Sequence, residues 1–330
     1  MISLENTVEH NLDFNPEHFD HYRGQEDLKK KLILYTHAAQ LRNEPLDHLL
    51  LFGPPGLGKT TLCTIMAKMM HVDIKICSGP MLERTGDLVS LLSNLQRKDI
   101  LFIDEIHRIP VAVEEVLYTA MENFRIDIII GQGAGAQSIN LPLQPFTLIG
   151  ATTKIGTISA PLRSRFGIIE RLDYYSLQDL QGIIIDNARY LALEINESSA
   201  LLIAHASRGT PRIAKKLLRR VRDFAQVENN NVIDDAITLH ALNFLGIDQS
   251  GLHRLDNMLL QVIIEKFDGG PVGLETLASL LSEDSTTLEE VHEPYLIRMG
   301  YLEKTSRGRQ IPYKVLPLLK KKFFGQDVIS

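Results

Sequence analysis

A glycine-rich segment, Gly53-Pro-Pro-Gly-Leu-Gly-Lys-Thr60, has the spacing of a phosphate-binding loop, because two glycines enclose four residues and are followed by lysine and threonine. Glycines let successive backbone N–H groups converge on phosphate oxygens, and the N-terminus of a following helix adds positive potential. We expect Lys59 to reach the β- and γ-phosphates of a nucleotide and the Thr60 hydroxyl to ligate Mg²⁺. The segment therefore predicts binding of a nucleoside triphosphate.

Two acidic side chains, Asp104 and Glu105, directly follow the apolar run 99–103. At the carboxyl end of a strand in a parallel sheet, such acids lie at the crevice where ligands bind. We expect Asp104 to hold Mg²⁺ through water and Glu105 to polarise the attacking water as a general base. Two interpretations of His107 stay open, a hydrogen-bonded structural residue and a participant in catalysis.

Hydroxyl and guanidinium groups follow later in the chain. Thr152 or Thr153, after a third apolar run, is suited to orient water near the γ-phosphate. Arg163 and Arg165 lie on a short loop, where an arginine forms a surface ion pair or enters the nucleotide site of a neighbouring subunit. The second role contributes roughly 10³–10⁵ in rate. Arg212 opens a basic helix and is a candidate to close onto the γ-phosphate.

The elements that must position these residues are predicted from periodicity. Three short apolar runs, 48–52, 99–103 and 146–149, are typical of strands buried on both faces. Helical patterns precede or follow them, at 25–42 and 59–70. This alternation predicts a parallel sheet covered by helices on both faces, which is an α/β fold.

An insertion separates the second and third runs. Residues 114–124 have a helical pattern, and two extended arms, 126–130 and 138–143, then flank the glycine-rich stretch 131–135. We expect a β-hairpin inserted into the α/β core. From residue 176 to about 245 the pattern is helical throughout and predicts a small all-α domain, after which another unit begins.

Composition narrows the class of protein. The chain has 330 residues, 44% of them hydrophobic, and a formal net charge of −6, which predicts two or three globular domains. We find no signal peptide and no apolar run of about 18 residues. Cys63 and Cys77 are too few for a disulfide framework or a zinc site. We therefore expect a cytoplasmic protein that does not engage membranes.

Basic residues are unevenly distributed. Residues 212–222 hold six basic side chains and no acid, and residues 295–330 hold eight basic and two acidic ones. This asymmetry favours a polyanion such as nucleic acid, with a solvated helix face as the alternative.

The C-terminal unit has the pattern of a winged helix. Helical stretches at 274–281 and 287–299 precede two extended arms, 301–313, around a basic tip. The second helix is acidic and would repel phosphates, so we expect Lys304 on the wing to grip the DNA backbone without reading its sequence. Contact with a protein is the alternative.

These motifs resemble the AAA+ ATPases and, more closely, the RuvB family of Holliday-junction branch-migration motors. Five segments carry the resemblance, which extends from about residue 14 to 315: 49–61, 102–107, 146–153, 209–213 and 269–274. It implies a large AAA+ P-loop ATPase domain at 1–175 with the hairpin inserted at about 125–146. It also implies a small helical lid domain at 176–245 and a winged helix facing DNA at 246–330.

The resemblance further implies a homo-hexameric ring that pumps duplex DNA and drives branch migration in DNA recombination and repair. A RuvA-type protein would dock on the hairpin, which would explain the exposed apolar arms of that hairpin. A hairpin folded onto its own core is the alternative.

Carried over residue by residue, the resemblance assigns binding of ATP or ADP with Mg²⁺ to a set of positions. They are Phe14, Asn15, Gly56, Lys59, Thr60, Thr61, Tyr175 and, as a second sensor, Arg212. Arg165 would act in trans, Asn123, Phe124 and Arg125 would approach a nucleotide across the subunit boundary, and Arg309 would join Lys304 on DNA.

Two positions depart from the family pattern. The family usually reads Leu-Arg-Pro where this chain has Phe14-Asn15-Pro16, so a positive charge is missing and nucleotide affinity is expected to differ. Lys304 replaces an arginine, which keeps the charge but loses the bidentate fork.

Two other functions stay open. A clamp-loader or initiator ATPase shares the AAA+ core, but the hairpin and winged helix together count against a clamp loader. A DNA-binding switch, in which ATP only sets assembly, would not need Glu105 or Arg165. These residues favour an ATP hydrolase coupled to DNA translocation.

Overall fold

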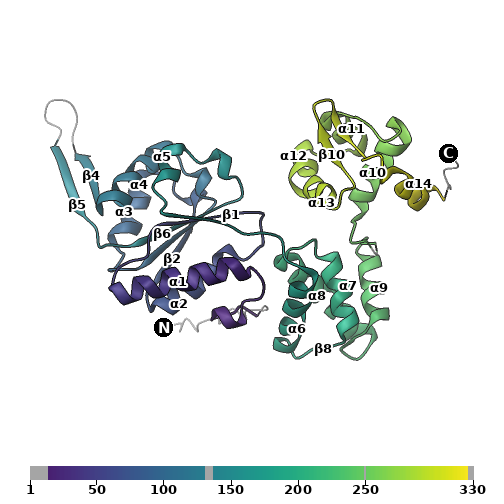
Figure 1. The fold of residues 1–330 in the computed structure, drawn as a ribbon, viewed down its shortest axis with the longest axis horizontal. Coiled ribbons are helices and arrows are strands. Elements are labelled where there is room, and N and C mark those ends of the chain that lie inside the picture. Colours follow the sequence, from purple (N-terminus) through teal and green to yellow (C-terminus); the bar gives the residue numbers. More distant parts are fainter. Residues whose placement is uncertain (1–13, 131–136, 249, 326–330) are drawn as a thin grey trace, which may run out of the picture.

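A five-stranded parallel sheet organises the first part of the chain (Figure 1). The computed structural model describes residues 14–130, 137–248 and 250–325. The strand order is β2-β3-β6-β1-β7, and the strands are β1 (Leu49–Phe52), β2 (Ile74–Ser78), β3 (Ile100–Asp104), β6 (Thr147–Thr152) and β7 (Ile168–Arg171). The three predicted strands are the central ones, and their carboxyl ends meet at one edge of the sheet.

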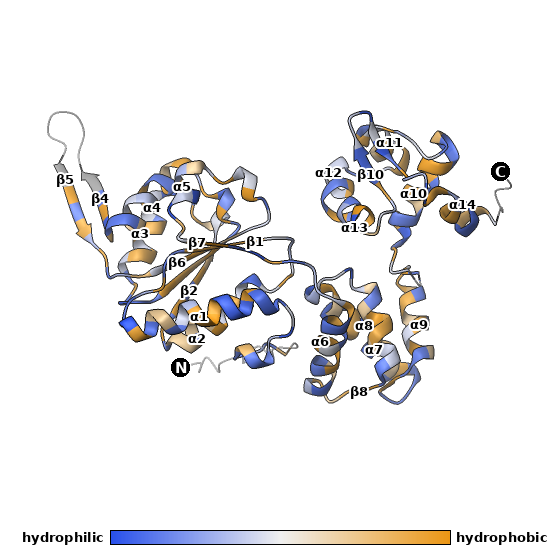
Figure 2. Ribbon diagram, viewed as in Figure 1, coloured by the Kyte–Doolittle hydropathy of each residue, from blue (hydrophilic) through white to orange (hydrophobic). Residues whose placement is uncertain are grey.

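Helices cover both faces of this sheet. One face packs against α1 (Glu26–Arg42) and α2 (Lys59–Met70), and the other against α3 (Thr85–Ser93), α4 (Val111–Asn123) and α5 (Ala160–Ser164). Neighbouring residues of β1 point to opposite faces, so Leu49 and Leu51 join one buried cluster while Leu50 joins the other. Figure 2 shows hydrophobic residues along the central strands. Burial of these apolar side chains on both faces provides the main stabilisation of the domain.

The inserted hairpin consists of β4 (Arg125–Ile130) and β5 (Gln137–Pro142), paired antiparallel from Arg125 opposite Pro142 to Ile130 opposite Gln137. It forms a separate two-stranded sheet and extends away from the domain in Figure 1. The glycine-rich stretch predicted at its tip, 131–135, lies outside the described residues.

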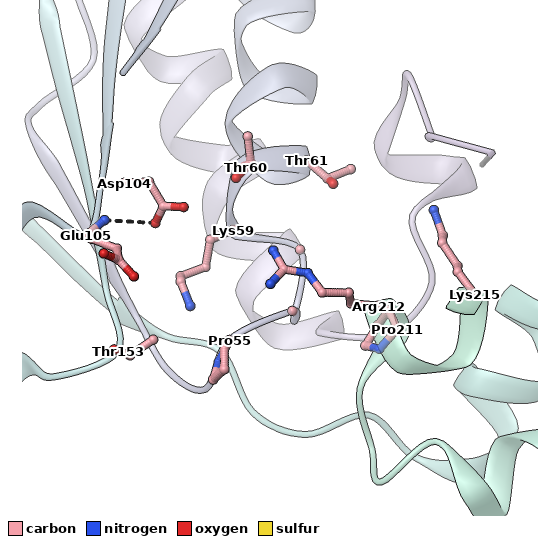
Figure 3. A pocket seen from close by; sticks show the side chains of 12 residues that line it. Pro55, Lys59, Thr60, Thr61, Asp104, Glu105, Thr153, Pro211, Arg212 and Lys215 are labelled. Atoms are coloured by element: carbon pink, nitrogen blue, oxygen red, sulfur yellow. Dashed lines mark hydrogen bonds between the residues drawn. The ribbon is translucent and has the colours of Figure 1, made fainter. Parts of the chain in front are cut away.

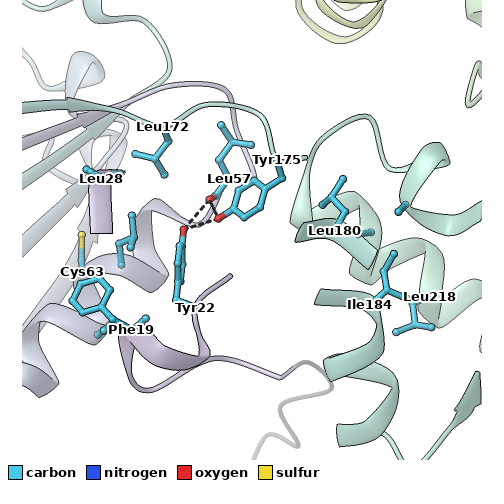
Figure 4. Packing of buried hydrophobic residues seen from close by; sticks show 14 of the residues in the cluster. Phe19, Tyr22, Leu28, Leu57, Cys63, Leu172, Tyr175, Leu180, Ile184 and Leu218 are labelled. Carbon is cyan, nitrogen blue, oxygen red and sulfur yellow. Dashed lines mark hydrogen bonds between the residues drawn. The ribbon is translucent and has the colours of Figure 1, made fainter. Parts of the chain in front are cut away.

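Four helices form the second part: α6 (Leu177–Tyr190), α7 (Glu197–Ala206), α8 (Pro211–Glu228) and α9 (Asp235–Phe244). A short parallel pair, β8 (Glu194–Ile195) with β9 (Val232–Ile233), interrupts the helical pattern expected throughout. Two-residue strands carry no detectable periodicity, so the sequence could not indicate them. Leu180, Ile184 and Leu218 of this part share a buried cluster with the first part (Figure 4).

The third part has its own buried cluster and contains the predicted winged helix. Its elements are α10 (Arg254–Phe267), α11 (Leu274–Leu281), α12 (Ser285–Thr287), a π-helical turn η6 (Leu288–His292), α13 (Glu293–Arg298), β10 (Glu303–Thr305), β11 (Gly308–Gln310) and α14 (Leu316–Phe324). The second helix, expected to be continuous over 287–299, is therefore a helix with a π-turn inside it. No described helix is long and apolar enough to cross a membrane.

Candidate active site

The glycine-rich loop joins β1 to α2 and takes a backbone conformation that glycine favours. Gly56 and Gly58 have φ values of +78° and +95°, which side chains rarely tolerate. Lys59 opens α2, and its ammonium group donates hydrogen bonds to the carbonyl oxygens of Gly53 (2.8 Å) and Pro54 (2.9 Å). Burial lowers the pKa of the Lys59 ammonium; nearby Asp104 opposes this shift and Arg212 adds to it.

A cavity of about 290 Å³ lies beside this loop (Figure 3). Its lining brings together predicted site residues from four regions of the chain: Gly56, Lys59, Thr60 and Thr61 from the loop and α2, Asp104 and Glu105 from the end of β3, Thr153 from the end of β6, and Arg212 from α8. Of the two threonines left open by the sequence, Thr153 lines the cavity, whereas Thr152 is buried.

The acidic pair follows β3 through an unusual backbone turn. Glu105 has a φ of +48°, and its backbone N–H donates to the Asp104 carboxylate (2.9 Å). Its own carboxylate lies 3.0 Å from an Arg108 guanidinium nitrogen. Arg108 was not expected to contribute, and an i,i+3 pair on a three-residue turn has no clear sequence signal.

His107 links the acidic segment to the end of β6. Its Nδ1 lies 3.0 Å from the Thr152 hydroxyl, which also accepts a hydrogen bond from the Lys154 backbone N–H (2.9 Å). Partial burial lowers the pKa of the His107 imidazole. In this arrangement His107 holds the turn on which Thr153 reaches the cavity, and it does not itself line that cavity.

The helical domain closes one side of the cavity. The backbone N–H of Arg212 lies 3.3 Å from the Gly56 carbonyl oxygen. A Cβ added at Gly56 would approach the Thr210 methyl carbon to 2.8 Å and the Arg212 Cβ to 2.9 Å. Loop and helical domain are therefore in direct contact, and the Arg212 side chain extends toward the same space as Lys59 (Figure 3).

A second, smaller cavity of about 60 Å³ adjoins the first, and the two share four lining residues: Gly58, Thr61, Pro211 and Lys215. Aromatic and aliphatic side chains, which suit a nucleotide base, line part of it: Phe14, Pro16, Tyr22, Tyr175 and Ile183. Polar and charged side chains line the rest: His21, Arg23, Asp186, Asn187 and Lys215. The lining in the described part of the chain includes Phe14 but not Asn15.

Two tyrosines fix one wall of this smaller cavity (Figure 4). The Tyr175 hydroxyl lies 2.7 Å from the Tyr22 hydroxyl and donates to the Leu57 carbonyl oxygen (3.0 Å). Burial raises the pKa of Tyr175 to about 12. Tyr22 was not predicted; a lone tyrosine in a short polar segment gives no motif.

Residues predicted to act across a subunit boundary lie together, away from this cavity. Arg165 follows α5 and forms an ion pair with Glu122 (3.0 Å), while its guanidinium stacks over the Tyr118 ring (4.4 Å to the centroid). Glu122 precedes Asn123 and Arg125, whose side chains are exposed.

Phe124 of the same segment packs inward. Its ring lies 5.8 Å from that of Phe146 and 6.3 Å from that of His48, measured between centroids. Only the flanking Asn123 and Arg125 present side chains to solvent.

The oxygen donors that line the first cavity indicate whether it suits Mg²⁺. Thr60 supplies a hydroxyl and Asp104 a carboxylate in the same cavity, and no group of three or more His, Cys, Asp or Glu able to hold a metal occurs among the described residues. A site with only a few hard oxygen donors suits a cation such as Mg²⁺, which is held mainly by the phosphates of the substrate and by water.

The predicted DNA-binding residues occupy the wing. Lys304 on β10 lies opposite Arg309 on β11. Both form ion pairs with Glu289 and Glu293 of the neighbouring helical segment. The sequence indicated an acidic helix but not that its acids contact the wing.

Comparisons with known proteins cover the whole architecture. Residues 14–172 match the Holliday junction DNA helicase RuvB P-loop domain, residues 175–248 the RuvB AAA lid domain, and residues 249–320 the RuvB C-terminal winged helix domain. A Holliday junction branch migration complex subunit RuvB from Fusobacterium nucleatum is 51% identical over 320 residues, covering 97% of this chain and 96% of that protein.

Solved structures of RuvB proteins are similar to this chain over nearly its whole length. The Thermotoga maritima RuvB Holliday junction branch migration motor is 47% identical, with a TM-score of 0.81 over 93% of this chain and 98% of that one. A mutant of Thermotoga maritima RuvB is 48% identical, with a TM-score of 0.83 over 93% and 99% of the two chains.

Proposed function

Because this chain belongs to the RuvB family, we propose that it is a motor that couples ATP hydrolysis to movement along duplex DNA. Its role would be branch migration of Holliday junctions in DNA recombination and repair, together with a RuvA-type protein. Membership makes the chain an AAA+ P-loop ATPase. The coupling to DNA, the ring and the residue roles are the proposal.

One observation carries the proposal: the residues expected at a nucleotide site form two groups at separate places in the chain, which we interpret as two halves of that site. One half is the cavity formed by the loop, the acids, Thr153 and Arg212. The other half contains Arg165 beside Glu122 and the exposed Asn123 and Arg125, none of which lines that cavity in the described structure. A head-to-tail contact would bring the two halves together, and such contacts generate closed rings where the rotation between subunits closes. A homo-hexamer is the ring we propose.

Each residue of the cavity then has a chemical task. Lys59 and Arg212 compensate negative charge on the β- and γ-phosphates, and Thr153 orients the attacking water. Glu105 accepts a proton from that water. Arg165 of a neighbouring subunit supplies a further positive charge to the transition state. Thr60 and Asp104 would hold Mg²⁺, which would neutralise negative charge on the phosphates.

The hairpin is proposed as the docking element for a RuvA-type protein. β4 and β5 stand apart from the five-stranded sheet, and Ile139 on β5 is 47% exposed. An exposed β-branched side chain on a two-stranded ribbon favours a partner protein, since such edges otherwise promote aggregation. The base of the hairpin packs on the core through Ile126, whereas Ile139 farther along β5 is exposed, so the alternative of a hairpin folded onto its own core holds for the base alone.

A mixing experiment tests the shared site. Glu105→Gln and Arg165→Ala should each reduce ATP turnover at least about 100-fold. When equal amounts are mixed, about a quarter of the interfaces in random rings pair an intact Glu105 with an intact Arg165, so turnover should partly recover. Arg163→Ala, which removes an exposed arginine two residues earlier, inside α5, is the matched control and should retain turnover.

Absence of recovery at any mixing ratio would contradict the shared site. Full activity of a dilute monomer would contradict it equally. The DNA function is tested by dissociation of a synthetic four-way junction with ATP, with and without a RuvA-type protein. A pure nucleotide switch would bind the junction without dissociating it.

A further inference from the structure

Four charged side chains connect the wing to the helical segment beside it. The Lys304 ammonium nitrogen lies 2.9 Å from a Glu289 carboxylate oxygen and 2.8 Å from one of Glu293. The Arg309 Nε lies 2.8 Å from Glu293, and its Nη2 lies 3.4 Å from Glu289. Each acid contacts both bases, so the formal charges of this wing network cancel.

The two acids of the wing network are not equivalent. The Glu293 side chain is 1% exposed, whereas that of Glu289 is 49% exposed. Removing the partners of a buried carboxylate leaves an uncompensated charge, which is strongly unfavourable. An exposed ion pair is weak and exchanges readily with solvent and salt. An incoming anion can therefore displace Glu289 from the wing network but not Glu293.

Hydrogen bonds hold the backbone of the wing in place, so displacement of Glu289 by an anion would involve side chains alone. Arg309 and Val272 exchange two backbone hydrogen bonds of 2.7 and 2.8 Å, which anchor β11 to the loop before α11. The neighbouring acid, Glu290, is engaged elsewhere, because it pairs with Lys154 of the ATPase domain (2.8 Å). Glu289 is thus the displaceable acid of this network.

We propose that Glu289 is a built-in competitor of DNA phosphate for Lys304 and Arg309. Its carboxylate occupies both cations when DNA is absent and leaves them when a backbone phosphate binds. This inference rests on the proposed function, which makes Lys304 and Arg309 DNA contacts. This competition lowers the net binding free energy that each phosphate contact contributes. A motor that releases the backbone at every step requires such weak, sequence-independent contacts.

Substitution Glu289→Gln keeps the size of the side chain and removes its charge. Glu303→Gln is the matched control, because Glu303 lies on β10 beside Lys304 and contacts Gln310 rather than a wing cation. It changes the net charge of the wing equally, so long-range electrostatic effects cancel in the comparison.

The experiment uses the full chain and measures binding of a fluorescent mixed-sequence duplex by anisotropy between 50 and 200 mM salt. Relative to Glu303→Gln, Glu289→Gln should bind about two- to fivefold more tightly, the range expected for loss of one exposed ion pair. Its plot of log affinity against log salt should be steeper by up to about 0.9, because Lys304 then releases a counterion from DNA without at the same time giving up the Glu289 carboxylate.

A third variant, Lys304→Ala, distinguishes failure of the Glu289 competition from failure of the proposed DNA contact. In the Lys304→Ala background, Glu289→Gln should gain much less affinity, since the main cation for which it competes is gone. Equal affinities of Glu289→Gln and Glu303→Gln, with Lys304→Ala weakened, would overturn the competition and leave the DNA contact intact. Wild-type affinity for both Lys304→Ala and Arg309→Ala would instead remove the DNA contact itself, and the competition with it.

A purely structural role of Glu289 gives a different result. In that case Glu289→Gln would lower the unfolding temperature of the chain and leave DNA affinity unchanged or weaker than in Glu303→Gln. That combination would also overturn the proposal.

Discussion

Replacing Arg212 by alanine should separate the stability of the chain from its affinity for ATP. Arg212 and Lys59 are both cations on one cavity, and Arg212 contributes to the lowered pKa of the Lys59 ammonium. Without nucleotide, removal of one of two like charges relieves repulsion while it also loses some packing. We expect the free energy of unfolding of Arg212→Ala without nucleotide to stay within about 1 kcal/mol of wild type.

Binding of ATP should respond much more strongly. A charge-assisted hydrogen bond to phosphate contributes about 1.5–3 kcal/mol, so the dissociation constant should rise roughly 10- to 150-fold. At a ligand concentration 100 times the wild-type constant, wild type gains about 2.7 kcal/mol of stability. A variant weakened 100-fold gains only about 0.4 kcal/mol under the same conditions.

Urea unfolding with and without a non-hydrolysable ATP analogue and Mg²⁺ measures both quantities, and calorimetric titration gives the dissociation constant directly. Lys216→Ala is the matched control, because Lys216 is exposed on the same helix and does not line the cavity. Arg212→Lys keeps the charge but not the fork and should fall between the two. Analogue affinity of Arg212→Ala equal to that of Lys216→Ala would refute the role of Arg212. A loss of more than about 2 kcal/mol without nucleotide would show that Arg212 acts through folding instead.

Three further predictions concern packing, hydrogen bonding and pH. Gly150→Ala should destabilise the chain by about 1–3 kcal/mol in urea unfolding, because the added Cβ would lie 2.8 Å from a buried isoleucine methyl carbon. Gly86 lies in a helix, and a Cβ added there would have no atom within 4 Å, so Gly86→Ala should stabilise the chain slightly. Equal effects of the two substitutions would contradict the packing argument. Tyr175→Phe should cost about 1 kcal/mol of stability and change ATP affinity less than about threefold, since only the hydroxyl is lost; a tenfold affinity loss in titration would show that the hydroxyl contacts nucleotide. Burial, aided by the nearby Arg208, lowers the pKa of His253 to about 4. Between pH 6.5 and 4 the unfolded chain therefore takes up a proton that the folded chain resists, and the melting temperature should fall as the pH is lowered. A His253→Gln variant with the same pH dependence of the melting temperature would disprove this.

The sequence predicted the centre of the sheet and missed its edges for one physical reason. Strands β1, β3 and β6 are buried on both faces and therefore appear as continuous apolar runs. The edge strands β2 and β7 are partly exposed and contain Lys75, Glu170 and Arg171, so their pattern is no longer apolar. Edge strands carry such charges to avoid pairing with other chains.

The candidate site divides in the same way. Lys59, Asp104 and Glu105 could be predicted because phosphate binding demands fixed residue types at fixed positions relative to strands and helices. The contact of Tyr175 with Tyr22 could not, because it depends on how two segments pack, and that of Glu105 with Arg108 could not, because it depends on a turn with positive φ at Glu105. Arg212 lies between these cases: a helix start identified it, but only the structure brings it against Gly56.

The third part of the chain, here called the head (described residues 250–325), contacts both the ATPase core and the helical lid through ion pairs of very different burial. Arg208 of the lid forms a buried ion pair with Asp256 of the head, and Asp256 also accepts hydrogen bonds from His292 and from the His253 backbone. Removing either partner alone would leave a buried charge uncompensated, which costs about 3–5 kcal/mol. A direct link from the ATPase core to the head, Lys154 with Glu290, is half exposed on both sides and contributes about 1 kcal/mol at most.

We expect the position of the head to follow the lid, because the buried Arg208–Asp256 pair joins the two. Arg298 of the head stacks over Tyr174 (4.1 Å to the centroid), and a Cβ at Gly209 would meet its guanidinium. Gly209 lies only three residues before Arg212. We expect a shift of Arg212 on the nucleotide phosphates to move the head together with the lid, and thereby to link the nucleotide site to the wing.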